Sequence, residues 1–113
     1  ATEWEAMSVV GAYCGWNPSN FIAQMTKMNG NPHIWRLKID MPFVEASDNG
    51  VKFVGNNAFG NNYVPVDQWS NPYGVCELNP AGRDVNIVRD EGGDFLFILN
   101  TLTGHYVMMK LND

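Results

Sequence analysis

The segment Ile34–Met41 (IWRLKIDM) constrains the fold most strongly, because apolar and charged side chains alternate along it. Trp35, Leu37, Ile39 and Met41 fall on one face of an extended chain, whereas the other face carries charged residues. A repeat of two residues is typical of a strand with one buried face, since a helix would repeat every ~3.6 residues. The sequence therefore predicts a half-buried β-strand that ends at Pro42.

Other β-runs are separated by turns rich in glycine, proline and asparagine. They are residues 7–13, 51–54 and 85–89, and a C-terminal hairpin of residues 94–100 and 105–111. Leu96 and Ile98 face away from Phe95 and Phe97, so we expect their strand to be central and covered on both sides. Only residues 21–28 predict a helical turn.

These short runs predict an all-β fold, an antiparallel β-sandwich of about seven to eight strands. The 113 residues suffice for one domain, 1–113, which we expect to be one module of a larger protein. Residues 14–32 and 55–82 carry no strong strand signal. Because compact domains seldom keep such long loops without a use, we expect the function to lie in these two segments.

The charge balance limits the classes of partner. Seven basic and twelve acidic residues give a net charge of −5, only 17% of residues are charged, and there are fourteen asparagines. Nucleic-acid-binding modules present a basic patch that this sequence lacks, so no nucleic acid is expected. No apolar run approaches the ~18 residues of a membrane span. We expect a monomeric domain with a neutral polar partner and no direct membrane insertion.

The residues capable of catalysis form no recognisable motif. There is no GxSxG sequence, and the carboxylates are scattered through turns rather than paired. His33 and His105 are too few for a zinc site without carboxylate help, and no CxxC is present. The acidic turn at residues 90–94 lacks the spacing of a calcium loop, which leaves a structural calcium open but not indicated. We expect no enzyme, no metal and no cofactor.

The two cysteines, Cys14 and Cys76, lie far apart in the sequence. One disulfide in an oxidising compartment and two separate buried thiols are both compatible with this separation. The pairing stays open on the sequence alone.

Residues 55–74 (GNNAFGNNYVPVDQWSNPYG) interleave aromatic side chains with amides. A sugar ring offers an apolar face that stacks on an aromatic ring, and hydroxyls that bond to amide and ammonium groups. Trp69 and Tyr73 are expected to stack on successive rings, with Trp16 or Tyr63 as a third contact. The expected hydrogen-bonding residues of this carbohydrate site are Asn61, Asn62, Gln68, Asn71, Lys52 and Lys27.

The same residues also have a purely structural interpretation. The aromatic side chains can plug the ends of a sandwich, and asparagine tolerates left-handed turns. Trp16 is then a plug beneath its loop, Trp35 belongs to the core, and Trp4 is left undecided. The residue types alone do not separate this interpretation from a binding surface.

Several short motifs follow one another along the whole chain. Near the start they are Ser8-Val9-Val10-Gly11, Gly15-Trp16-Asn17 and Met25-Thr26-Lys27. They continue as Val51-Lys52-Phe53, Phe59-Gly60-Asn61-Asn62-Tyr63, Asn86-Ile87 and Gly93-Asp94-Phe95-Leu96-Phe97, then Thr103 and Tyr106. This ordered set resembles starch-binding domains of the SusE/SusF type, from lipid-anchored starch-utilisation proteins of the Bacteroidetes outer membrane. Phe59 and Val64 depart from that pattern, and residues 64–74 form an insertion that brings Trp69 and Tyr73.

The resemblance implies an Ig-like β-sandwich that binds polysaccharide, does no chemistry and lies extracellularly, at a bacterial cell surface. Starch or another α-glucan is the first expected ligand, followed by plant glycans such as xylan or β-glucan. A non-binding Ig-like spacer and a protein–protein adhesion domain, with Trp and Tyr as hot spots, stay open as alternatives. Burial of both Trp69 and Tyr73 would exclude the binding surface.

Overall fold

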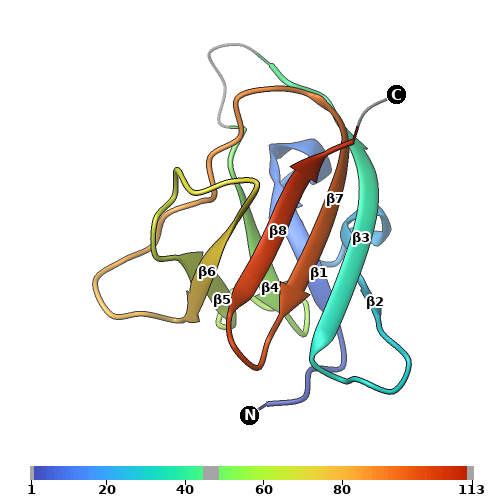
Figure 1. The fold of residues 1–113 in the computed structure, drawn as a ribbon, viewed down its shortest axis with the longest axis vertical. Coiled ribbons are helices and arrows are strands. Elements are labelled where there is room, and N and C mark those ends of the chain that lie inside the picture. The colour runs from blue at the N-terminus through green and yellow to red at the C-terminus, as the bar shows by residue number, and fades with distance from the viewer. Residues whose placement is uncertain (1, 45–48, 112–113) are drawn as a thin grey trace.

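The regular secondary structure of the chain is almost entirely β-strand in a computed structural model that describes residues 2–44 and 49–111 (Figure 1). The described strands are β1 (Met7–Gly11), β2 (Thr26–Lys27), β3 (Ile34–Met41), β4 (Val51–Gly55), β5 (Asn62–Pro65), β6 (Tyr73–Leu78), β7 (Gly93–Asn100) and β8 (His105–Lys110). Two short 3₁₀ turns, η1 (Ala12–Cys14) and η2 (Phe21–Ala23), follow β1. Within the described ranges no helix is long and apolar enough to cross a membrane.

The strands pair antiparallel in one continuous sheet, in the order β1-β4-β5-β6-β8-β7-β3-β2. The sheet curls until its two ends nearly meet. There the Met25 N–H donates to the Met7 carbonyl at 2.8 Å, and Ser8 forms a β-bridge with Gln24. The all-β antiparallel fold expected from the sequence is confirmed. The two-layer sandwich is not, because the strands form a nearly closed, barrel-like sheet.

The longest ladder, between β3 and β7, uses the alternation seen in the sequence. It pairs every residue of β3, from Ile34 opposite Asn100 to Met41 opposite Gly93. Trp35 and Leu99 both face the interior and are buried, as the sequence predicted for Trp35. Since successive side chains of a strand point to opposite sides, the same register turns the other half of each strand outward.

The core fills the interior of the curled sheet with apolar and aromatic side chains. Phe53 of β4 meets Phe97 of β7 edge to face, with ring centroids 6.2 Å apart and planes at 79°. Trp4 is also buried here, and its indole N–H donates to the Tyr63 hydroxyl at 2.8 Å. Trp4, undecided on the sequence, is therefore a core residue that connects the N-terminal segment to β5.

A second, smaller cluster covers the outside of β1 and β4. It consists of Val10, Cys14, Ala23 and Val54, with the η1 and η2 segment folded over the two strands. Asn20 begins η2 by accepting a hydrogen bond from the Ile22 N–H at 3.2 Å. The predicted helical turn at 21–28 is thus only the three-residue η2, and Thr26 and Lys27 form a strand instead.

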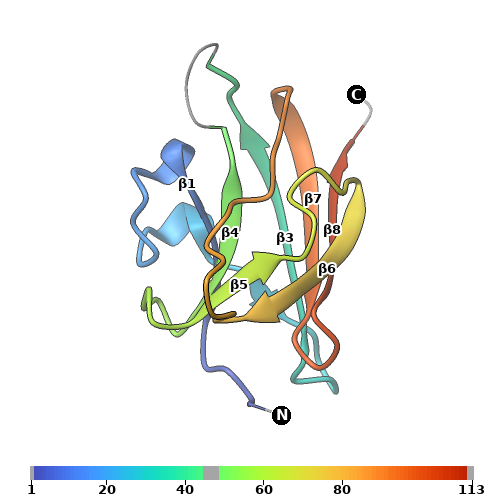
Figure 2. The ribbon, with the colours of Figure 1, turned by 90° about the vertical axis from the view of Figure 1, so that its left-hand side faces the viewer.

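The segment between β6 and β7 crosses the opening between β4 and the β7–β8 pair (Figure 2). It forms one β-bridge, between Ile87 and Val51, with hydrogen bonds of 3.0 and 2.8 Å. The strand predicted at 85–89 is therefore reduced to a single bridge. It pairs with β4 only at Val51, because the Val88 N–H turns to the Gln68 carbonyl, at 2.8 Å.

Sequence patterns did not reveal β5 and β6. Each is short, and β5 begins at Asn62 and ends at Pro65, residue types that are typical of turns. In β6, glycine occupies the inward position 74, where a Cβ atom would lie 2.7 Å from the Tyr106 hydroxyl. The Tyr106 ring fills the space of the missing side chain, so the apolar alternation expected of a strand is absent from the sequence.

Cys14 and Cys76 are free thiols in the structure, which answers the question left open by the sequence. Cys14 belongs to the small outer cluster, where its thiol donates to the Gly11 carbonyl at 3.3 Å. Cys76 belongs to the main core, and burial raises its thiol pKa to about 12. A neutral, buried thiol is a poor nucleophile at ordinary pH.

We therefore expect the native protein to resist alkylation by iodoacetamide at pH 8, because both thiols are buried. Unfolding in urea without a reductant should allow two adducts per chain, as counted by intact-mass spectrometry. A chain that takes up label only after reduction would instead contain a disulfide.

Arg89 connects three backbone segments at one end of the sheet. The side chain is 6% exposed, and its three nitrogens donate to the carbonyls of Asn49, Glu91 and Pro42 at 3.2, 2.8 and 3.1 Å. The guanidinium also lies 5.5 Å from the Phe95 ring centroid. Burial lowers the pKa of this group, so the carbonyl oxygens must replace the water that it loses.

Arg89→Met should lower the free energy of unfolding by about 3 kcal/mol, because three backbone carbonyls lose the buried charged donor that joins them. Urea unfolding followed by tryptophan fluorescence measures this loss. Arg83→Met is the matched control: Arg83 pairs with the exposed Glu77 and donates to one backbone carbonyl, that of Pro65, so its loss should cost only ~1 kcal/mol. Equal losses in the two variants would contradict this role of Arg89.

Candidate functional site

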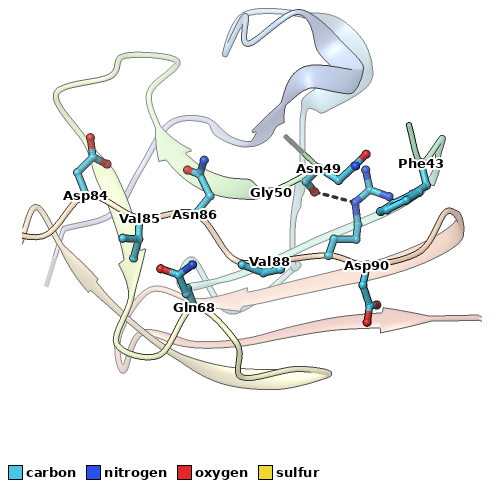
Figure 3. Close-up of a pocket in the computed structure, with 10 residues that line it drawn as sticks. Phe43, Asn49, Gly50, Gln68, Asp84, Val85, Asn86, Val88 and Asp90 are labelled. Carbon is cyan, nitrogen blue, oxygen red and sulfur yellow. Dashed lines mark hydrogen bonds between the residues drawn. The ribbon is translucent and has the colours of Figure 1, made fainter. Parts of the chain in front are cut away.

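Two hollows on the protein surface are candidates for a binding site, and they differ in chemistry. The first, the end pocket, has a volume of about 390 Å³ and lies beside the crossing segment (Figure 3). The second lies on the outer face, defined as the outward side of β6, β8, β7, β3 and β2. Figure 1 looks onto β8, β7 and β3, which lie in front of β1 and β4.

The end pocket mixes apolar and polar residues, and two of its charged side chains already have partners. It is lined by Phe43, Asn49, Gly50, Gln68, Asp84, Val85, Asn86, Val88, Arg89 and Asp90. Asp84 pairs with Lys52 at 2.8 Å, and Arg89 is occupied by its three carbonyls. Arg89 donates to the carbonyl of Asn49, one of the lining residues labelled in Figure 3. These contacts tie loops together, which gives the end pocket a structural role.

The outer face carries a shallow open hollow of about 570 Å³. It is lined by Ile34, Ser70, Tyr73, Gly74, Val75, Ile98, Asn100, His105, Tyr106 and Val107. Tyr73, Val107 and Ile98 are directly opposite one another on β6, β8 and β7. Cross-strand partners share a face, so these three side chains form a row across the sheet. The hollow is thus an apolar floor with an aromatic ring at one end.

Hydrogen bonds around the start of β6 fix the position of Tyr73. The Tyr106 hydroxyl donates to the Ser70 carbonyl at 2.6 Å, and the Ser70 hydroxyl donates to the Tyr73 carbonyl at 2.7 Å. Burial raises the pKa of Tyr106 well above its usual range, which keeps its hydroxyl protonated as a donor. The exposed ring of Tyr73 is therefore mounted on a backbone that is tied to the core.

The hollow also contains polar side chains suited to hydrogen bonding. Asn100 accepts a bond from the Leu102 N–H at 3.0 Å, and His105 Nδ1 lies 2.8 Å from the Thr103 hydroxyl. These contacts orient both side chains at the edge of the apolar floor. No group of three His, Cys, Asp or Glu side chains that could hold a metal ion occurs in residues 2–44 and 49–111.

Both aromatic residues with the strongest sequence case are exposed. Trp69 and Tyr73 are each 70% accessible. Burial of both residues would have excluded the binding surface, and neither is buried. Trp69 lies in a turn where its backbone N–H donates to the Asp67 carboxylate at 3.0 Å. Only Tyr73 lines the outer-face hollow, so the two rings do not both belong to it.

The two other predicted aromatic contacts have structural positions. Tyr63 is 4% exposed and accepts the Trp4 hydrogen bond, so it is a core residue rather than a surface contact. Trp16 packs against the small outer cluster, in the position of a plug beneath its loop, and has a φ of 56°. Neither residue lines the hollow that contains Tyr73.

Most of the predicted amide residues hold turns. The side-chain nitrogens of Asn61, Asn62 and Asn71 donate to the carbonyls of Gly55, Phe59 and Val88. Asn56, Asn57 and Asn79 adopt positive φ angles, the other structural use of asparagine. Gln68 lines the end pocket, so the amides predicted to bind sugar do not gather at one surface.

The predicted lysines separate in the same way. Lys52 is 8% exposed and forms an ion pair with Asp84, so it faces no open surface. Lys27 lies 5.2 Å above the Trp35 ring and lines a second hollow on the outer face, of about 300 Å³. Lys27 lies opposite Trp35, whose side chain faces the interior, so neither lysine points outward from the strands of the outer face.

Several residues of the outer face were missed as site candidates. Leu96 and Ile98 were expected to be covered, but they are only half-buried, and no described element packs over them. Their outward apolar side chains were the available signal, together with Val107 on the neighbouring strand. Sequence alone could not separate a second buried face from an apolar surface, because both give the same continuous apolar run.

Comparison with protein-family models, with curated proteins and with solved structures finds no match to this chain.

The two tyrosines of the candidate region should respond differently to loss of the hydroxyl. Tyr63→Phe leaves the buried Trp4 indole N–H without an acceptor and should lower the free energy of unfolding by about 1–2 kcal/mol. Tyr73→Phe removes only an exposed hydroxyl and should change it by less than ~0.5 kcal/mol. Urea titration measures both, and equal changes would contradict these assignments.

Proposed function

We propose that this domain binds polysaccharide on its outer face, at the hollow that contains Tyr73, and catalyses no reaction. The observation that carries the proposal is the ring of Tyr73, which is 70% exposed on a strand whose backbone is hydrogen-bonded to the core. An exposed aromatic ring on a strand of this kind is a ready surface for the apolar face of a sugar.

The surroundings of Tyr73 fit a sugar chain better than a compact ligand. The hollow is open and shallow, with Val107 and Ile98 as floor and Ser70, Asn100 and His105 as hydrogen-bonding groups. An open surface accepts internal residues of a polymer, whereas an enclosed pocket would select chain ends. The Ser70 hydroxyl already donates to a backbone carbonyl, so it serves as an acceptor rather than a nucleophile.

The resemblance to SusE/SusF-type domains is the basis for three further parts of the proposal: the ranking of the ligands, the Ig-like sandwich and the extracellular location. Starch-like α-glucan stands first, then xylan or β-glucan, in an extracellular module of a bacterial cell-surface protein. The Ig-like sandwich is proposed on the same basis. It is supported by β6, which pairs with β8 through residues 73–75 and with β5 through residues 76–78 and so bends between two halves of the sheet.

The test is affinity electrophoresis of the protein in gels containing amylose, pullulan, xylan, β-glucan, mannan or polygalacturonate. At least one polymer should retard the protein, with a dissociation constant in the high micromolar to millimolar range. Tyr73→Ala should weaken that binding about fivefold, since a stacked ring contributes on the order of 1 kcal/mol. Its thermal unfolding should stay unchanged, because the ring is exposed.

Phe21→Ala is the matched control, because Phe21 is 85% exposed but lies in η2, next to β1 and away from the outer face. It should leave retardation unchanged. The proposal is wrong if none of the polymers retards the protein, or if Tyr73→Ala binds as well as the unmodified chain.

A further inference from the structure

Three cations of this acidic protein form no ion pair in the described part of the chain, and all three lie on β2 and β3. They are Lys27, Arg36 and Lys38. The remaining four basic residues are occupied elsewhere: Lys52 pairs with Asp84, Arg83 with Glu77 and Lys110 with Glu91, while Arg89 is bound by backbone carbonyls. These cations therefore lie at one edge of the sheet, where Arg36 and Lys38 are on its outer face and Lys27 lies over the Trp35 ring.

This edge is continuous with the hollow that contains Tyr73. The smaller hollow of about 300 Å³, which Lys27 and Arg36 line, shares Ile34 and Ile98 with the hollow that contains Tyr73. In the ladders, Tyr73 faces Val107, Val107 faces Ile98, and Ile98 faces Arg36. One row thus crosses four strands, from an exposed ring at one end to an exposed guanidinium at the other.

The length of this row sets the kind of ligand that can use both ends. Neighbouring strands are ~4.8 Å apart, so the three steps from Tyr73 to Arg36 span roughly 14 Å. A monosaccharide cannot reach both groups, whereas several linked sugars can. The apolar floor between the ends lets the intervening rings pass over the sheet.

Resting on the function proposed above, we propose that the ligand is a linear polysaccharide that carries uronic-acid carboxylates, which places such polymers ahead of the neutral α-glucan that the resemblance puts first. One ring stacks on Tyr73, and a carboxylate several sugars away pairs with Arg36, with Lys38 beside it on the same face of β3. The planar guanidinium fork matches a carboxylate with two parallel hydrogen bonds, which a hydroxyl cannot reproduce.

The neighbouring acids define where the anionic group can lie. Asp40 follows Lys38 on the same outward face of β3, and Asp94 lies opposite Asp40 on β7. These carboxylates repel an anion from the far end of the two strands. Arg36 lies one outward position further from Asp40 than Lys38 does, next to the apolar floor. The favourable position for the ligand's carboxylate is therefore between Ile98 and β2.

The experiment compares polygalacturonate and glucuronoxylan with the same two polymers after reduction of their carboxyl groups. Isothermal titration calorimetry and affinity electrophoresis should show tighter binding to the uronate forms than to the reduced forms. This difference in affinity should shrink as the salt concentration rises, because exposed charges are screened. The double variant Arg36→Gln, Lys38→Gln should weaken uronate binding about tenfold, as expected for two exposed ion pairs. It should leave binding to the reduced polymers unchanged.

Arg83→Gln is the matched control, since it removes the same kind of charge from a residue already paired with Glu77. It should bind like the unmodified chain. Equal affinity for native and reduced polymers, an unaffected double variant, or equally tight binding of poly-glutamate would overturn the uronate inference and leave polysaccharide binding intact. Failure of every polymer to bind, or Tyr73→Ala without effect on any polymer, would overturn the proposed function itself.

Discussion

The register between β3, β7 and β8 is the constraint on which the rest of the structure depends. It aligns Trp35 with Leu99 and Phe97 with Met108 inside the sheet, where these side chains form the core. A shift of one residue would bring the charged and half-exposed side chains of all three strands into that core. The same register places Tyr73, Val107, Ile98 and Arg36 in one outward row, so the core and the proposed binding surface have a common origin.

Much of this architecture could be predicted from the sequence, because β3, β7 and β8 carry clear apolar alternation. The closure of the sheet could not, since it depends on a bridge between Ser8 and Gln24 that has no local signature. β6 was missed because Gly74 occupies an inward position that Tyr106 fills from another strand. Where a residue from a distant segment completes the packing, the local pattern loses its information.

The candidate site was predicted in part. Tyr73 and Trp69 were identified by their chemistry and are exposed, but the asparagines near them serve the turns that hold the chain. The sequence also suggested a neutral partner from the overall charge. The overall charge does not show how the charges are distributed: among the described residues, three ion pairs and a buried arginine leave the cations without an ion pair on β2 and β3.

The central claim is that the outer face, and not the end pocket, binds the glycan. An NMR titration of the isotope-labelled protein with oligosaccharides cut from a retarding polymer tests it most directly. Shift changes should centre on Tyr73, Val107 and Ile98 and extend toward Arg36. Changes centred instead on Gln68 and Asn86, in the end pocket, would contradict the account.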